Sequence, residues 1–580
     1  MPKFRLEISS MRSVNDLRAR LGMNNTKRKT SMKKTGLALL LASLLMGCGA
    51  NGDSSSAAAI GAKTSLLAAT LQFFTGGAEV KTYAAARLLD HASFGPTDAA
   101  IADVKARGIE GWIDHQFVLP ASQIDASFTE DWDSNTTPGV LGRPYYELFP
   151  RAFMALMLSG DDQLRLRTTF ALSQFIVITD AKIQSFGTTQ YFNLLQDHAF
   201  GNFADLLRAV ATSPSMGVFL DNNQNKKEGV CDSCSINENF ARELMQLFTL
   251  GVTRLNKDGS VQRDAAGKLI ETYTQDDVQG MARALTGWDT VWNPLGKRNG
   301  FYRLPMVAQW VDSHDTGEKK LLGKTIAAGG TAEQDLDSVI AILMAHPNIA
   351  PHLSLRMIQH LVTSDPSPAY LSRVASVFEN NGSGVRGDMK ALVRAILLDP
   401  EARRGDDASV QERTIGKVRE PVLHFSAKLR GIQCRTALSD SSGNMYGVNN
   451  QQPFNATSVF SFYSPTYRAA GSNLLAPEQK LLISQEFSAR LGGLSWIANS
   501  VPQNLSSAGC KLDEFVTALA TSKRAFLNLA SARYFRGSMP PPLRDSAESL
   551  VDQLSWMGPT EKAATMIQFL LFSPAFGVIK

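Results

Sequence analysis

Apolar residues recur with a helical spacing over most of the chain beyond residue 84. In residues 235–251 the apolar positions fall at i, i+4, i+7 and i+8, which places them on one face of a helix. These positions are Phe240, Leu244, Leu247 and Phe248. The same period returns in 203–210, 336–343 and 389–397. The pattern predicts a mainly α fold, a large irregular helical bundle.

Several of these helices are predicted to end in the same way. At four places an apolar helical stretch runs up to a proline, and proline disfavours helical geometry in the residue before it. The residues before proline are Ser213, His346, Asp399 and Ser573. Their spacing is irregular, which argues against a solenoid of repeats.

Both ends of the 235–251 helix are marked in the sequence. Ser235 is followed three residues later by Glu238, and this pair is typical of a capping box. Gly251 tolerates the left-handed conformation that closes many helices. We therefore predict a helix capped at Ser235 and closed at Gly251.

The polar face of this predicted helix carries the first candidate site. Asn239, Arg242 and Glu243 place an amide, a guanidinium and a carboxylate within about one turn. Charges paired on a helix surface are often structural, so a solvated face is the alternative. Our hypothesis is that Glu238 serves the cap while these three residues form a buried polar network beside a pocket.

Two stretches interrupt the helical pattern. Residues 255–273 contain an Asp-Gly pair and predict a short hairpin, and residues 291–330 predict a small β excursion. Because a chain of 580 residues exceeds one ordinary core, we expect two lobes. The predicted lobes are 84–290, which contains the central helix, and 331–580.

The first part of the chain resembles a bacterial lipoprotein leader. Residues 32–47 combine a charged start, a short apolar run and a small residue before Cys48, so we predict a signal peptide and a lipid on Cys48. The apolar run is too short to span a membrane. We interpret 1–31 as an extension that does not belong to the native protein, and 48–83 as a flexible tether.

This leader predicts the location of the protein. Gly49, which follows Cys48, resembles the default pattern for sorting to the outer membrane. We therefore expect a lipid-anchored protein of the cell envelope that faces the periplasm or the exterior. The membrane is its first predicted partner.

The charge of the chain changes once this leader is set aside. Of 59 Lys/Arg and 54 Asp/Glu, ten and two lie in residues 1–47, so 49 basic and 52 acidic residues remain. The remainder is thus close to neutral and lacks a basic stripe with interleaved aromatic residues. We predict no binding of nucleic acid.

The cysteines leave several possibilities open. Cys231 and Cys234 lie just before the central helix, and in an oxidising compartment they are candidates for a disulfide. A free or redox-active pair and two zinc ligands are the alternatives. Cys434 and Cys510 are the remaining possible pair. We predict no metal site and no cofactor.

Two loops carry further candidate residues. Residues 382–387 read G-x-G-x-x-G, but a helical pattern precedes them where a dinucleotide site needs a strand. Backbone amides with Gly384, Arg386 and Gly387 remain a candidate anion site. In the β excursion, His314 precedes Asp315, and a carboxylate can orient an imidazole for chemistry.

Eight ordered segments of the chain resemble a large bacterial family described as domain of unknown function 1800. The segments are 94–97, 237–251, 273–278, 282–288, 314–315, 346–348, 381–388 and 417–421. The resemblance runs from about residue 84 onward. It implies no activity, since the family has none established. It does imply a possible partner, because members are often encoded beside an exported, sulfatase-like protein.

Two functional hypotheses follow. The first is a lipid-anchored protein that binds or positions an exported partner. The alternative is an extracytoplasmic hydrolase that uses acidic residues near the 237–243 helix. Binding is favoured, because no nucleophile–base pair and no set of metal ligands emerges from the motifs.

Overall fold

The structure is a computed structural model in which the residues from 80 onward are described with gaps. The described ranges are 80–125, 148–230, 235–291, 300–308, 311–410, 416–435, 450–487, 490 and 509–580. Residues 79–580 form one compact unit. The predicted leader, Cys48 and the tether as far as residue 79 lie outside the described residues, and so do Cys231 and Cys234.

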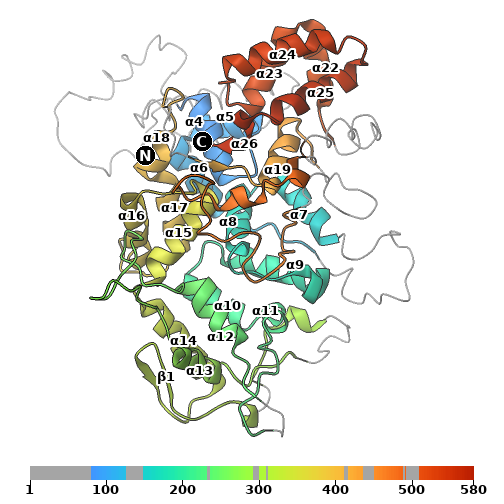
Figure 1. Ribbon diagram of the computed structural model, residues 1–580. Coiled ribbons are helices and arrows are strands. Elements are labelled where there is room, and N and C mark those ends of the chain that lie inside the picture. Colours follow the sequence, from blue (N-terminus) through green and yellow to red (C-terminus); the bar gives the residue numbers. More distant parts are fainter. Residues whose placement is uncertain are drawn as a thin grey trace, which may run out of the picture. The chain divides into compact units, whose positions relative to one another are not determined.

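The first half of this unit is helical, as predicted (Figure 1). Its helices are α4 (Thr82–Ala92), α5 (Asp98–Arg107), α6 (Ile109–Val118), α7 (Leu148–Ser159), α8 (Gln163–Ser173), α9 (Asp180–His198), α10 (Phe203–Ala211), α11 (Pro214–Phe219), α12 (Asn239–Glu243), the π-helix η4 (Leu244–Thr249) and α13 (Gln275–Ala284).

The second half continues in the same manner after a short β hairpin. Its elements are the 3-10 helices η5 (Gly300–Arg303) and η6 (Val311–Ser313), β1 (Lys319–Leu321), β2 (Lys324–Ile326), α14 (Ala332–Ala345), α15 (Ile349–Leu361), α16 (Pro368–Glu379), α17 (Met389–Leu398), α18 (Pro400–Arg404), β3 (Lys417–Val418), α19 (Pro421–Gly431), the 3-10 helix η7 (Pro477–Leu481), α22 (Leu512–Thr521), α23 (Lys523–Tyr534), α24 (Pro541–Gln553), α25 (Pro559–Leu571), α26 (Pro574–Gly577) and β4 (Val578–Ile579).

The proline rule held at each of its four sites. Helices α10, α14, α17 and α25 end within three residues before the prolines in question. At three of these sites the proline also begins the next helix, because its fixed φ suits the first helical position and its missing amide hydrogen is not needed there.

Strands are confined to small antiparallel pairs among the described residues. β1 pairs with β2 inside the predicted 291–330 excursion, and β3 pairs with β4 across a long stretch of sequence. Isolated bridges from Thr253–Glu271 to Arg263–Leu269 confirm the predicted hairpin after the central helix. The mainly α fold with a small β excursion is therefore confirmed.

Helices from the two expected lobes pack against one another. α8 contacts α15, α10 contacts α14, and α7 contacts α19, while α22 to α25 pack together in the red part of Figure 1. Phenylalanines of α7 and α9 meet Phe454, which lies far along the chain, edge to face. The division into lobes within this unit stays a prediction.

The central helix begins later than the sequence predicted. α12 starts at Asn239, its first turn has no side-chain cap, and Ser235 does not cap it. The carboxamide of Asn225 holds the backbone of Asn237 from both sides, at 2.9 and 2.8 Å. This clamp keeps residue 237 out of the helix, so Glu238 stands at the helix start and the capping box does not form.

The end of this helix is a π turn. The Leu250 amide donates to Met245 O at 2.8 Å, and the Thr249 hydroxyl donates to Leu244 O at 2.6 Å. Gly251 has a φ of +72°, as the left-handed ending predicted. Phe240, Leu244 and Phe248 are buried, so the predicted apolar face is confirmed.

Two further features complete the description of the fold. Cys434 and Cys510 form a disulfide. Among the described residues, no single helix has the length and apolar character needed to cross a membrane. α14 and α15 meet those criteria only as a pair, which is bent by 77°.

Candidate functional site

Arg242 of α12 forms a closed group with Glu238 and Gln275 at the surface. Arg242 Nη2 lies 2.8 Å from Glu238 Oε2 and donates to Gln275 Oε1 at 3.2 Å. Gln275 Nε2 in turn donates to the same Glu238 oxygen at 2.8 Å. The side chains of Arg242 and Glu238 are 38% and 29% exposed, so this is a half-exposed ion pair and not the predicted buried network.

Glu243 differs from its neighbours because it is buried without a matching cation. Its residue is 6% exposed, and Oε2 has no hydrogen-bond partner among the described residues. Burial raises the pKa of this carboxyl, and the positive charge of Arg242 opposes the shift only in part. Asn239 contacts Asp221 instead, at 3.4 Å, so the predicted three-residue network does not form.

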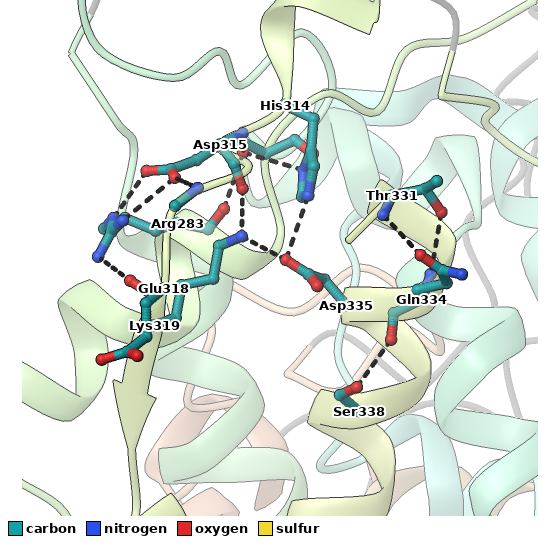
Figure 2. Close-up of polar contacts among 11 residues, drawn as sticks. Arg283, His314, Asp315, Glu318, Lys319, Thr331, Gln334, Asp335 and Ser338 are labelled. Carbon is teal, nitrogen blue, oxygen red and sulfur yellow. Dashed lines mark hydrogen bonds and ion pairs between the residues drawn. The ribbon is translucent and has the colours of Figure 1, made fainter. Parts of the chain in front are cut away.

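Asp315 binds an arginine and does not orient His314 as we had expected. Arg283, at the end of α13, donates from Nε to Asp315 Oδ2 at 2.7 Å and from Nη2 to Asp315 Oδ1 at 3.1 Å (Figure 2). The amide of Gly317 adds a third donor at 2.8 Å. These donors hold the pKa of Asp315 below its usual value although burial alone would raise it.

His314 is held by a different carboxylate, that of Asp335 on α14. His314 Nε2 lies 3.2 Å from Asp335 Oδ2 (Figure 2). Its Nδ1 lies 2.9 Å from Thr286 O. Lys319, whose side chain is fully buried, bonds to Asp335 and to Asp315 O. A Cβ at Gly287 would lie 2.9 Å from His314 Cβ, so the imidazole is tightly enclosed.

This arrangement acts as a buried brace between α13, β1 and α14. Both carboxylates and both cations find partners within the chain, which is the condition for stable buried ion pairs. Neither His314 nor Asp315 lines the cavity described below. The geometry assigns this cluster a structural role.

The predicted anion loop uses its own side chains to satisfy its amides. Asn380 Oδ1 accepts from the amides of Gly382 and Gly384, each at 2.9 Å. Arg386 Nε donates to Met344 O at 2.5 Å, so this cation caps the end of α14. Gly387 has a φ of +81° and donates its amide to Phe378 O, which makes it part of the turn into α17. The residues that we predicted to bind an anion therefore hold the loop itself in place.

A cavity of about 810 Å³ lies between segments that are distant in sequence. Its walls come from the end of α15, the start of α16, the short helix α18, the 258–260 turn and Leu475. Most of the lining surface is apolar. Its volume falls within the range of pockets that enclose small ligands, roughly 300–1,000 Å³.

The cavity wall rests on a second buried ion pair. Lys417 Nζ lies 2.7 Å from Glu420 Oε1 and donates to Gln359 O at 2.9 Å, near the end of α15. Burial alone would raise the pKa of Glu420, but Lys417 and other nearby cations lower it to about 2. The Thr363 hydroxyl, on the cavity wall, donates to Gly416 O at 3.0 Å. This ion pair therefore supports the part of the cavity wall that is formed by the end of α15.

Arg87 of α4 also lines the cavity, and it is fully buried. Its Nη1 donates to Ala402 O and, at 3.0 Å, to Asp406 Oδ1. Nε and Nη2 have no hydrogen-bond partner among the described residues. Burial and the nearby Arg403 lower the pKa of Arg87 to about 10, so its guanidinium is still charged at neutral pH. Sequence motifs did not point to Arg87.

No group of three or more histidine, cysteine or acidic side chains suited to a metal ion occurs in the described ranges. Comparison with known proteins adds one match. The family model described as "Protein of unknown function (DUF1800)" matches residues 87–578. No curated protein and no solved structure matches the chain.

Proposed function

The chain belongs to this family of proteins of unknown function, and on that premise we propose that it is a lipid-anchored protein of the cell envelope that binds and positions an exported partner. The observation that carries the proposal is the cavity of about 810 Å³ with largely apolar walls. Binding sites for small ligands and short chain segments combine such walls with a few oriented polar groups. The proposed occupant is a segment of the partner.

The polar groups of the cavity suit binding because most of them already support its wall. The Ser367 amide donates to Glu401 Oε1 at 3.0 Å, and the Ser367 hydroxyl donates to the other oxygen of that carboxylate. Arg373 is held by Asp399 through two contacts of 2.7 Å. These pairs keep the walls in place without reference to a ligand, which favours a preformed pocket.

A cavity-filling substitution tests this proposal. Ala369 is an exposed residue of α16 that lines the cavity, whereas Ser376, on the same helix, is exposed away from it. The probe is an exported, sulfatase-like protein of the kind that the family resemblance implies is encoded nearby. We expect it to bind the wild type and Ser376→Trp, and to bind Ala369→Trp at least about tenfold more weakly, a change of about 1.4 kcal/mol. No binding to the wild type would contradict the proposal.

The anchor is tested separately. The complete three-part leader before Cys48 supports lipid attachment at its sulfur. Intact-mass measurement of protein extracted from membranes should show a mature chain that begins at Cys48 and carries lipid. Cys48→Ser should release the protein from the membrane fraction, and unchanged membrane association would refute the anchor.

One observation favours the second candidate, an extracytoplasmic hydrolase. Glu243 combines burial, a raised pKa and an unpartnered oxygen, and it immediately precedes a π turn. Perturbed carboxyl groups and π turns are both more common at functional sites than elsewhere. If this alternative holds, Glu243→Gln abolishes turnover while the thermal midpoint stays the same, whereas partner binding by the cavity is unaffected.

A further inference from the structure

The unpaired atoms of Arg87 are the two that form one edge of its guanidinium. Nη1 is occupied by Ala402 O and Asp406, while Nε and Nη2 lack partners among the described residues. These two nitrogens point their hydrogens in parallel, which matches the two oxygens of a carboxylate. A buried arginine therefore leaves its two-pronged donor edge without a partner among the described residues.

Two other arginines of the chain show what this edge binds when it is filled. Arg283 uses Nε and Nη2 to hold the two oxygens of Asp315, at 2.7 and 3.1 Å. Arg373, which lines the same cavity as Arg87, holds Asp399 through the same two nitrogens. In both cases the occupant is a carboxylate from the chain itself.

The backbone of Gly405 packs closely against this guanidinium. A Cβ at Gly405 would lie 2.8 Å from Cζ, Nε and Nη2 of Arg87, so a side chain at this position would collide with the guanidinium. Gly405 has a φ of −78°, which any residue adopts, so backbone conformation does not require a glycine here. Removing a cation from water without pairing all its donors costs stability, and a bound anion would offset that cost.

We propose that the cavity binds the carboxylate of an elongated, largely apolar ligand, with Nε and Nη2 of Arg87 as the anchor. The inference rests on the proposed partner binding and deepens it, since the end of a partner's polypeptide carries such a carboxylate. The apolar walls contact the body of the ligand, and Arg87 fixes its charged end. A free aliphatic acid carries the same chemistry.

The charges that line the cavity favour a ligand with one negative charge over a ligand with two. Three arginines line the cavity, and three acidic side chains, those of Asp258, Asp365 and Glu401, line it as well. A phosphate dianion would meet these carboxylates with its second charge, whereas a carboxylate needs only one open donor edge. The chemical class is therefore a monocarboxylate.

Binding of matched acid and amide probes to the full chain tests the proposal. The first pair is an N-acetylated apolar tetrapeptide as free acid and as C-terminal amide, and the second is hexanoate and hexanamide. We expect at least one acid to bind about tenfold more tightly than its amide by calorimetry, because only the acid completes the paired contact. Equal binding of acid and amide in both pairs, or no binding of either acid, overturns the proposal.

Variants of the same cavity locate the anchor. Arg87→Lys keeps the charge but loses the two-pronged edge, and Gly405→Ala places a methyl group against it; each should weaken acid binding about tenfold. Arg283→Lys is the matched control, because its edge is occupied by Asp315 and it does not line the cavity, and it should change binding less than about threefold. If Arg87→Lys does not fold, Gly405→Ala decides. Acid binding unchanged in a folded Arg87→Lys or in Gly405→Ala refutes the anchor.

The outcomes separate this inference from the proposed function. If the sulfatase-like partner binds and Ala369→Trp weakens it, but acids and amides bind alike, partner binding stands and the carboxylate anchor is wrong. If hexanoate shows the preference and the peptide acid does not, the carboxylate site stands with a free acid as its source. Phosphate binding tighter than either acid overturns the monocarboxylate assignment.

Discussion

The brace around Asp335 and the cavity around Arg87 contain the same types of charged residue. They differ in how completely these side chains are paired. In the brace, Arg283 and Lys319 both find carboxylates of the chain (Figure 2). In the cavity, Arg373 finds Asp399 but Arg87 keeps two nitrogens unpaired. In the first region both cations have a carboxylate partner from the chain. In the second, Arg87 lacks a partner for two of its nitrogens.

This difference teaches how to separate scaffold from site in a chain rich in buried charge. Shifted pKa values do not separate them, since burial lowers the pKa of Arg87 and nearby cations lower that of Glu420, which lies in a fully paired cluster. The hydrogen-bond partners do separate them. A buried group whose donors are all paired stabilises the fold, and one with open donors beside a cavity is a candidate for ligand binding.

The largest expected effect comes from breaking the brace. Asp335→Asn leaves Lys319 fully buried without a countercharge and should lower the free energy of unfolding by about 3–5 kcal/mol. Asp337, on the same helix, is 63% exposed and pairs with Arg208, so Asp337→Asn should cost less than about 1 kcal/mol. Chemical denaturation measures both. Equal costs would show that the brace is not a closed unit.

Lowering the pH should destabilise α15, which lines the cavity, before it destabilises the brace. His352 and His360 of α15 are buried, and burial lowers the pKa of each to about 3. Between the ordinary pKa of about 6.5 and that value, the unfolded chain binds protons that the folded chain does not, so stability falls as pH falls, by about 1.4 kcal/mol per pH unit per histidine. The pKa of Asp315 is lowered, so its ion pair is lost only below the usual carboxyl range.

Hydrogen exchange at pH 5 and pH 7, corrected for intrinsic rates, checks this order. Protection should drop in α15 and persist in α13 and β1. His352→Gln should reduce the dependence of stability on pH between about 6.5 and 3, since one of the buried histidines no longer titrates. If α13 loses protection first, the assignment of acid sensitivity to α15 is wrong.

Neutral replacements of the two arginines sharpen the comparison further. Arg283→Met removes two charge-assisted hydrogen bonds to Asp315 and should cost about 1.5–3 kcal/mol. Arg87→Met removes a cation whose donors are only partly paired, and should cost less while abolishing acid binding. Denaturation and calorimetry of the same preparations give both values. A greater cost at Arg87 would mean that its charge serves the fold.

The smallest effect is expected at the surface of α12. Arg242 and Glu238 are partly exposed, so Arg242→Ala should lower the unfolding free energy by less than about 1 kcal/mol. A loss of 3 kcal/mol or more would restore the buried network that we first predicted. Partner binding measured on the same variant tests whether this surface contributes to recognition.

Local rules in the sequence predicted the helices well. The apolar stripe of Phe240 and Leu244, the left-handed Gly251 and the proline-limited helix ends depend on neighbours within a few residues. The start of α12 escaped prediction because Asn225, which is distant in sequence, holds Asn237. A local capping rule has no access to that contact.

The candidate site depended on contacts that no spacing reveals. Arg283 binds a carboxylate 32 residues away, and His314 is held by one 21 residues away. The other residues that line the cavity with Arg87 lie more than 170 residues later in the chain. The pair His314-Asp315 was prominent as a motif, yet its two side chains turn to different partners. Adjacency in sequence is weak evidence for contact between side chains.

The pairing of β3 with β4 has a consequence for biogenesis. β4 at Val578–Ile579 pairs with Lys417–Val418 and contacts α4, the helix that carries Arg87. The surroundings of α4 are therefore incomplete until residue 579 has emerged, although α4 itself begins at Thr82. A chain whose early helix waits for such late residues stays open to chaperones and to a secretion channel for most of its synthesis. Transport before folding would suit the place in the cell envelope that we propose for this protein.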